Sequence, residues 1–399
     1  MSGYHPGVTI ATMKSNRSRL LFVVVSLCAL ASLRAVAGPE GSGRDPATRA
    51  LSIFSEVFSL TRSNYVEATD TKALLEGAYD GMSDALDPFS YYVPVSAMAA
   101  YKAQQAAGAA SPGILFARRG GYPYVVGPLP GSPAEKAGVK PGDLIDSIDG
   151  QPLRNAPVWK IKAALEGPEG SSCELVLFRG GDEKRVTLPV GRARFDAPPV
   201  SSKWERDVAI IKIPTFTPST AAAIRKELDE ASRRSINTVV LDVRGSIGGA
   251  IPDAAPAAAL FVAKGPIATV VSRKAAEKPL EATGDPVWKG KVVLLIDDST
   301  AGAAEVFAAA LHDRVKAPTV GETTVGMAII QKNVPTEEGG NLFMTVGRYV
   351  SPSGQVLGGK GLSPDERVIV IPGESGDRDA ILERGLAVAR GEAAARKAA

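Results

Sequence analysis

The stretch from Asp297 to Gln331 holds the residues whose types and spacing most suggest chemistry. The apolar run 291–296 before it predicts a buried strand, and the helix formers Ala303–Leu311 predict a helix just after it. Residues 298–300 (Asp-Ser-Thr) are of the types that cap a helix start. A sharp strand-to-helix turn exposes free backbone N–H groups, and serine hydrolases place their nucleophile at such turns. In this turn the corresponding residue is a glycine, Gly302.

This stretch resembles the core of the C-terminal processing (tail-specific) serine proteases. Their motif reads Ser-Ala-Ser-Ala-Ser-Glu, then a helix, then Gly-Glu-x-Thr-x-Gly-Lys-Gly. Aligning Glu305 with the motif glutamate places Gly302 on the nucleophile, and residues 321–326 (Gly-Glu-Thr-Thr-Val-Gly) match the second motif. Met327 then falls on the general-base lysine, at the family's own spacing from Gly302. Gln331 matches a glutamine that orients the family's lysine.

The two replacements would disable the chemistry that the resemblance implies. A serine–lysine dyad needs a hydroxyl that attacks and a neutral lysine that accepts its proton. Glycine has no nucleophilic atom, and the thioether of methionine cannot accept a proton at neutral pH. Dyad members act as a unit, so either change should remove most covalent catalysis. We therefore expect a pseudopeptidase; an active serine peptidase that uses a non-standard residue is the alternative.

Few other side chains could restore catalysis. Ser246 is the only serine of a glycine-rich loop, and Ser299 is the hydroxyl nearest Gly302, although we expect it to cap the helix. His312 is the only histidine beyond the N-terminal segment, and it lies about three helical turns past Gly302, too far to serve that turn. One histidine and one cysteine cannot supply the usual zinc ligands, so we expect no metal and no other cofactor.

Length and charge limit the class of protein. A chain of 399 residues predicts two or three domains. The net charge is +3, but residues 1–37 hold four basic and no acidic side chains, which leaves the remainder almost neutral. This balance gives no indication of a nucleic acid or an anionic membrane as partner.

The N-terminal 37 residues have the pattern of an export signal. Basic residues precede the apolar run 20–33, and Ala35-Val36-Ala37 offers a small-x-small cleavage site. We expect an exported protein, periplasmic or associated with the cell envelope; an uncleaved anchor is the alternative. After cleavage Cys173 would be the one remaining cysteine, so no internal disulfide is expected.

Residues 38–111 predict a flexible linker and a helical N-terminal region, and residues 112–194 resemble a PDZ domain. The segment 112–116 (Pro-Gly-Ile-Leu-Phe) resembles the Gly-Leu-Gly-Phe-type loop of that module, and 132–153 matches its most specific part. We expect a β-rich fold with two helices, the second at about 157–165.

PDZ modules add a peptide strand to a sheet edge and hold its terminal carboxylate on loop N–H groups. The resemblance implies a peptide site formed by seven residues: Gly113, Ile114, Leu115, Phe116, Val158, Ile161 and Leu165. The expected ligands are C-terminal peptides of unfolded or exported proteins, presented or sequestered for a partner such as an active paralogous protease. A PDZ domain used only as a rigid spacer or lid is the alternative.

Residues 195–377 predict an α/β core. The strands 208–216, 238–245 and 291–296 alternate with helices at 217–234 and 246–262, which indicates a largely parallel sheet. Residues 244–249 resemble the family loop that forms one side of an oxyanion hole. Its donors would be the backbones of Gly248 and Gly249, with the N–H of Ala303 opposite.

Residues 378–399 predict a C-terminal helix and tail. The whole chain is thus expected to be an α/β multidomain protein with a helical N-terminal region, a PDZ domain and a protease-like core. We expect it to bind peptide tails without cleaving them. Besides an active peptidase, a structural envelope scaffold is the second alternative.

Overall fold

The computed structural model describes residues 45–106, 110–180, 184–273, 278–370 and 378–392. The predicted export signal, most of the predicted linker and the last seven residues of the tail lie outside the described residues. The chain divides into two compact units, residues 1–74 and 75–399. No described helix combines the length and the apolar character that a membrane crossing needs.

The described part of the first unit is dominated by helix α2 (Pro46–Asn64). Asp45 caps this helix by accepting a hydrogen bond from Ala47 N–H, and Pro46 occupies the first turn, where its missing N–H costs nothing. The apolar side chains of Leu51 and Val57 are exposed on α2.

Helix α3 (Thr71–Asp84) is followed by strand β1 (Tyr91–Val93) and helix α4 (Val95–Ala106). The sequence pattern predicts helix throughout residues 48–107, so the strand is a correction. It forms because Pro94 disfavours the helical conformation at Val93 and because aromatic and β-branched residues favour strands. Strand β1 pairs antiparallel with β16 (Asn341–Val350).

The PDZ-like part is an antiparallel sheet of six strands in the order β2-β3-β4-β6-β7, with β5 paired to β4. Its strands are β2 (Ile114–Arg119), β3 (Tyr122–Pro128), β4 (Leu144–Ile148), β5 (Gln151–Pro152), β6 (Ser172–Arg179) and β7 (Lys184–Gly191). Its two helices, α5 (Pro133–Ala137) and α6 (Val158–Leu165), confirm the prediction. Residues 114–116 were expected in a loop, but they form the start of β2, which is an edge strand of this sheet.

The core sheet has six strands in the order β17-β14-β13-β10-β9-β8. They are β8 (Ser201–Glu205), β9 (Val208–Lys212), β10 (Thr238–Asp242), β13 (Lys291–Ile296), β14 (Thr319–Gly321) and β17 (Glu366–Arg367). The pairs from β9 to β17 are parallel, and β8 pairs antiparallel with β9. The expected largely parallel sheet is confirmed.

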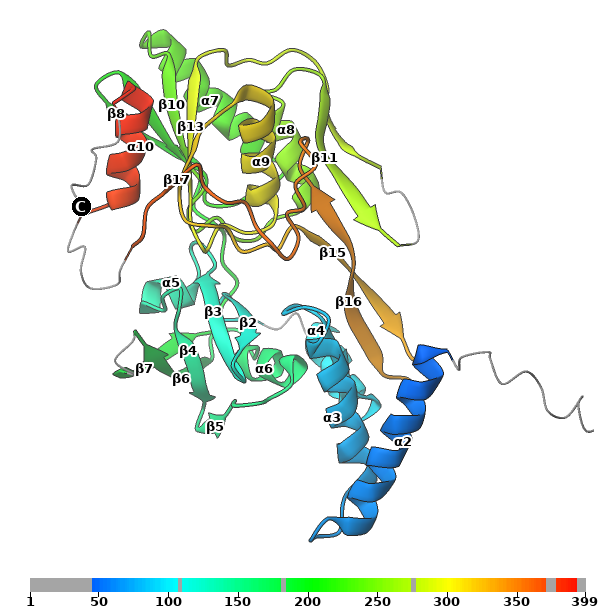
Figure 1. Ribbon diagram of the computed structural model, residues 1–399. Helices are drawn as coiled ribbons and strands as arrows, with labels where there is room; N and C mark the ends of the chain where they lie inside the picture. Colours follow the sequence, from blue (N-terminus) through cyan, green and yellow to red (C-terminus); the bar gives the residue numbers. More distant parts are fainter. Residues whose placement is uncertain (1–44, 107–109, 181–183, 274–277, 371–377, 393–399) are drawn as a thin grey trace, which may run out of the picture. The chain divides into compact units, whose positions relative to one another are not determined.

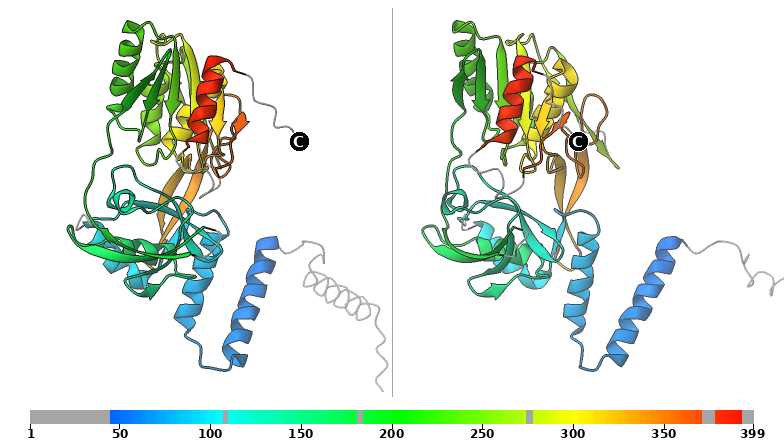
Figure 2. Two further views of the ribbon diagram at one scale, coloured as in Figure 1. Left: turned by 90° about the vertical axis from the view of Figure 1, so that its left-hand side faces the viewer. Right: turned by 60° about the vertical axis from the view of Figure 1, so that its left-hand side comes forward.

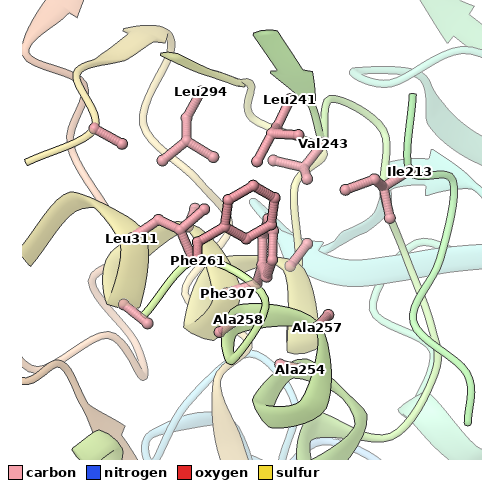
Figure 3. Close-up of a cluster of buried hydrophobic side chains, with 14 of the residues drawn as sticks. Ile213, Leu241, Val243, Ala254, Ala257, Ala258, Phe261, Leu294, Phe307 and Leu311 are labelled. Atoms are coloured by element: carbon pink, nitrogen blue, oxygen red, sulfur yellow. The ribbon is translucent and has the colours of Figure 1, made fainter. Parts of the chain in front are cut away.

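Helices cover both faces of this sheet (Figure 2). They are α7 (Thr220–Arg233), the 3-10 turn η1 (Ile251–Asp253), α8 (Ala254–Ala258), α9 (Ala303–Val315) and α10 (Ala380–Arg390). Alternate strand residues face opposite sides, so Leu241 packs with α7–α9 whereas Val240 packs with α10. Phe307 of α9 lies at the centre of the larger cluster, against Phe261 and the strand side chains (Figure 3).

Two predicted helices of this core differ from expectation. The helix predicted within 246–262 is only the five-residue α8 after a 3-10 turn, because Pro252 and Pro256 lack the N–H groups that a longer helix needs. Helix α7 begins at Thr220 with Ser219 as its N-cap, and not at Pro218.

A second sheet has the order β1-β16-β11-β12, with β15 (Ile329–Pro335) paired to β16. Strands β11 (Gly265–Ser272) and β12 (Leu280–Ala282) form its other side. The hairpin of β15 and β16 turns within residues 336–340. Strand β15 starts two residues after Met327, and it forms a long hairpin with β16 (Figure 1).

Candidate active-site cavity

A cavity of about 270 Å³ opens beside the N-terminus of α9. Its lining residues are Gly248, Gly249, Ile251, Ala301, Gly302, Met327, Ile329 and Gln331. Six residues were predicted for the catalytic positions and the oxyanion hole, and five of them line this cavity: Gly248, Gly249, Gly302, Met327 and Gln331. They come from the loop after β10, the N-cap of α9 and the segment at the start of β15. The sixth, Ala303, is the first residue of α9; it is buried and is not among the lining residues.

Gly302 has a backbone conformation that other residues adopt only with strain. Its φ is 64° and its ψ is −113°. A Cβ atom added there would meet no heavy atom within 4 Å. The turn thus has the positive-φ backbone of a strained strand-to-helix turn, with open space where a side chain would project.

Gly302 is also the N-cap of α9, so the predicted cap at residues 298–300 is wrong. Thr300 instead closes a turn with Asp297: its hydroxyl donates to Asp297 Oδ1 at 2.8 Å and accepts from Asp297 N–H at 3.0 Å. Ser299 Oγ donates to the carbonyl oxygen of Val126 at 2.8 Å, which joins the core to strand β3. Proximity to the helix predicted a cap, whereas a contact with a residue far away in the sequence determines the orientation of Ser299.

Glu305 is the fully buried residue that holds this turn together. Its Oε2 accepts from Gly302 N–H at 2.8 Å and Met327 N–H at 2.7 Å. Its Oε1 accepts from Thr324 Oγ1 at 2.5 Å and Gly326 N–H at 2.6 Å. Burial raises the pKa of Glu305 to about 6, although these four hydrogen bonds favour its ionised form.

In the sequence, Glu305 stands out only as the glutamate of the motif, and its role as a fourfold hydrogen-bond acceptor was not predicted. A glutamate at the third position of a helix is a capping-box residue that reaches back to the N-cap N–H. That signal was present in the sequence. The bonds to Thr324, Gly326 and Met327 carried no such local signal, because those residues are about twenty positions away.

Gln331 does line the cavity, but its amide is bonded outside it. Gln331 Nε2 donates to the carbonyl oxygen of Phe89 at 2.8 Å. Phe89 precedes β1, in a turn held by Asp87, which accepts from the N–H groups of Phe89 and Ser90. The amide therefore attaches the start of β15 to the segment that leads into β1.

The glycine-rich loop opposite Gly302 is fixed by close approaches. A Cβ atom at Gly249, where φ is 77°, would collide with the carbonyl of Phe216, so only glycine fits there. Gly245 N–H donates to Asp297 Oδ1 at 2.9 Å, and Ala301 N–H donates to the carbonyl oxygen of Ser246 at 3.0 Å. These bonds place the loop backbone beside the start of α9.

The alternative catalytic side chains do not line the cavity. Ser246 Oγ is buried without a hydrogen-bond partner among the described residues. His312, on α9, has Nδ1 at 2.9 Å from Asp313 Oδ1 and Nε2 at 3.3 Å from Asp365 Oδ1. Of the eight described lining residues, Gln331 alone has a polar side chain, and none carries a hydroxyl, thiol, amine, imidazole or carboxyl group.

A second cavity, of about 480 Å³, lies at the carboxyl ends of the core strands. It shares no lining residue with the first and includes Asp298 and Glu322. Burial and neighbouring carboxylates raise the pKa of both groups. No set of three metal-ligating side chains gathers within the described parts of the chain.

The predicted peptide site lies between β2 and α6. Ile161 and Leu165 of α6 are buried in the PDZ-like core, with Ile114 and Phe116 partly buried against them. Gly113 is also buried, and a Cβ there would collide with Ser132 and with the ring of Phe195. Six of the seven residues thus lie on β2 and α6, and Gly113 directly precedes β2. Whether they form a peptide site stays a prediction.

Three family models match the chain. Peptidase family S41 matches residues 207–368, a PDZ domain matches 124–179, and the activating protease CtpB N-terminal domain matches 32–96. The boundaries predicted above at 111/112, 194/195 and 377/378 stay predictions.

Curated relatives cover most of this chain. The carboxy-terminal processing protease CtpA of Bacillus subtilis is 29% identical over 318 residues, covering 78% of this chain and 67% of that protein. A protein of Staphylococcus aureus named "Probable CtpA-like serine protease" is 26% identical over 319 residues, covering 79% of this chain and 64% of that protein. The chain thus spans about two thirds of the length of these relatives, and less than two thirds of the second.

A solved structure shares the fold. The photosystem II D1 C-terminal processing protease superposes with a TM-score of 0.63 at 26% sequence identity, covering 79% of this chain and 92% of that one.

Proposed function

This chain belongs to the S41 C-terminal processing peptidase family and carries a PDZ domain, and we propose that it binds C-terminal peptide tails without cleaving them. One observation carries the proposal. Gly302 and Met327, which align with the family's nucleophile and general base, line one cavity. Its described lining offers neither an attacking atom nor a proton acceptor suited to a Ser-Lys mechanism.

The backbone around the cavity is still suited to hold a peptide carbonyl. The glycine-rich loop and the first N–H groups of α9 supply donors of the kind that stabilise an oxyanion. Glu305 fixes that turn by four hydrogen bonds. Such a cradle can bind a chain segment although no group attacks it.

The location and the clients follow from the export pattern of residues 1–37. In this proposal the protein acts in the periplasm or at the cell envelope and takes hold of the C-terminal ends of unfolded or exported proteins. It then sequesters them or presents them to a partner, such as an active paralogous protease.

Incubation of the purified protein with an unfolded substrate protein tests the absence of cleavage. We expect no fragments by mass spectrometry and no labelling by a fluorophosphonate probe. Fragments that persist after contaminating proteases are excluded would overturn the proposal.

Ser246 is the specific reason to keep an active peptidase as the second candidate. Its buried hydroxyl has no hydrogen-bond partner among the described residues, in the loop that borders the cavity. Cleavage or labelling that disappears in Ser246→Ala and persists in Ser299→Ala would establish this alternative. The matched control is suitable because Ser299 Oγ is already bonded to Val126.

Tail binding is tested separately, with a peptide of free C-terminus and apolar last residue. We expect saturable binding that is lost when the carboxylate is amidated, because PDZ modules hold that group on backbone N–H donors. Equal binding of the amidated peptide, or none of either, would leave only the scaffold role.

A further inference from the structure

The N-terminal half of helix α6 is already covered by another part of this chain. Val158, at its first position, is only 5% exposed. It shares a hydrophobic cluster with Tyr91 and Val93 of β1 and Met98 of α4. Phe116 of β2 packs against the same cluster, so the covering residues reach both sides of the predicted groove.

Polar contacts hold the covering segment along α6. Lys162 Nζ donates to Tyr91 OH at 3.1 Å and lies 4.4 Å from the centre of its ring. Gln104 Nε2 of α4 donates to the carbonyl oxygen of Ala163 at 3.2 Å. Both β1 and α4 therefore contact α6 (Figure 1).

A bound tail would need part of the same space. It would add to the edge of β2, with its last residue towards Ile114 and Leu165 and its upstream residues towards Phe116 and Val158. At the first end of this groove, Ile114 and Leu165 belong to the PDZ-like cluster, whereas at the second end Val158 and Phe116 pack with residues of β1 and α4.

We propose that residues 91–104, comprising β1 and most of α4, compete with the upstream part of a bound tail for the PDZ groove. The inference rests on the proposed tail-binding function. A tail then contacts the full length of the groove only when this segment moves away. The measured affinity is reduced because a fraction of the molecules has the segment in place.

Truncation of Met98 tests the competition. Met98→Ala weakens the packing of α4 against Val158 without altering a groove residue. By fluorescence anisotropy, we expect a labelled peptide of about ten residues ending in leucine to bind about tenfold more tightly to this variant than to the unaltered protein. A tripeptide with the same C-terminus should gain less than about twofold, since it does not reach Val158.

Two further variants complete the binding test, one as a control and one as a milder substitution. Met82→Ala removes a methionine side chain that is 59% exposed on α3, and we expect it to leave both affinities unchanged. Gln104→Ala removes the hydrogen bond to Ala163 but keeps the apolar contacts, so it serves if Met98→Ala does not fold. We expect a gain of about two- to threefold for the long peptide, the size of one modest hydrogen bond.

Hydrogen exchange supplies an independent readout. Addition of the long peptide to the unaltered protein should speed exchange of α4 amides, because the segment leaves its position. Slower exchange there, or equal or weaker binding by Met98→Ala, would overturn the competition and leave tail binding intact. Failure of all variants to bind any tail would instead remove the proposed function, and the competition with it.

Discussion

Gly302 and Met327 donate their backbone N–H groups to the same carboxylate oxygen, Oε2 of Glu305, at 2.8 and 2.7 Å. The two positions that align with a catalytic pair are thus linked through one buried side chain. Only backbone groups of these two residues take part in this link, and the side chain of Met327 does not. The framework can therefore stay in place when Gly302 and Met327 replace a serine and a lysine, because backbone groups and Glu305 maintain it.

Replacement of Glu305 by glutamine should change the pH dependence of stability. The pKa of Glu305 is about 6 in the folded chain, above the ordinary 4.5, so the folded state binds this proton more tightly than the unfolded state. Its contribution to the free energy of unfolding is therefore largest below pH 4.5 and falls by about 2 kcal/mol as the pH rises through 6. The introduced amide does not titrate.

Chemical denaturation of both proteins at pH 4 and pH 7 measures this effect. The stability of the unaltered protein minus that of Glu305→Gln should be about 2 kcal/mol smaller at pH 7 than at pH 4. All other titrating groups are shared and cancel in this difference. A difference that is constant or grows with pH would contradict the raised pKa.

Gly302→Ala should destabilise the fold although there is room for the methyl group. A Cβ at this position meets nothing within 4 Å, so the cost comes from the φ of 64° and should be about 1–2 kcal/mol. Gly77, within α3, is the matched control, since it also has no heavy atom within 4 Å of an added Cβ. Gly77→Ala should stabilise by roughly 0.5–1 kcal/mol through helix propensity. Thermal or denaturant unfolding of both variants decides whether their signs differ.

Local patterns predicted most of the α/β core and the PDZ-like sheet. The strand at 291–296 and the helix from Ala303 were expected from an apolar run and a series of helix formers, and both confirm the expectation. The apolar spacing in residues 48–107 predicted a helical region, and α2, α3 and α4 lie there. It missed β1 because a three-residue strand leaves almost no periodic signal. Its partner strand, β16, lies about 250 residues further along the chain.

Of the cavity beside α9, only the residues that align with a family motif could be predicted from the sequence. Gly248, Gly249, Gly302, Met327 and Gln331 do meet at one cavity. What the sequence did not predict are bonds between distant backbone and side-chain groups. The carbonyl oxygen of Phe89 accepts from Gln331, and that of Val126 accepts from Ser299. A carbonyl is present in every residue, so no residue type marks these partners.

Arg244 should be a large contributor to stability because it bridges two carboxylates. It donates to Asp242 Oδ2 at 2.8 Å and to Asp379 Oδ1 at 2.6 Å, joining the end of β10 to the start of α10. Asp242 is buried, and burial alone would raise its pKa. The hydrogen bonds of Arg244 and the positive charges of Arg244 and Lys212 outweigh this effect and hold the pKa of Asp242 below the ordinary 3.8. Arg244→Ala leaves the Asp242 carboxylate with only the ammonium of Lys212 and the backbone N–H of residue 244 as partners, and it should cost about 3 kcal/mol at pH 7.

The stability lost in Arg244→Ala should depend on pH, and it should exceed the loss at an exposed ion pair. Below about pH 4 Asp242 becomes protonated in the unfolded chain, so the difference between Arg244→Ala and the unaltered protein should shrink as the pH falls. Arg233→Ala is the control, since Arg233 pairs with Glu230 but its side chain is 69% exposed; we expect a loss below about 1 kcal/mol. Equal losses for the two variants in denaturant unfolding would contradict a special role of the Arg244 bridge.

The double variant Gly302→Ser, Met327→Lys should cleave unfolded protein, whereas each single variant should not. Space for the serine exists at residue 302, and an amine at residue 327 would enter a cavity whose described lining has no carboxyl group. Desolvation there lowers the pKa of a lysine, so that its neutral form can take the serine proton. Because the two groups act only together, we expect fragments in a digest, and labelling by fluorophosphonate, from the double variant alone. The Gly302→Ala, Met327→Lys variant is the matched control without the hydroxyl. An inactive double variant that keeps the unfolding cooperativity of the unaltered protein would mean that the cavity differs from a working site in more than these two side chains.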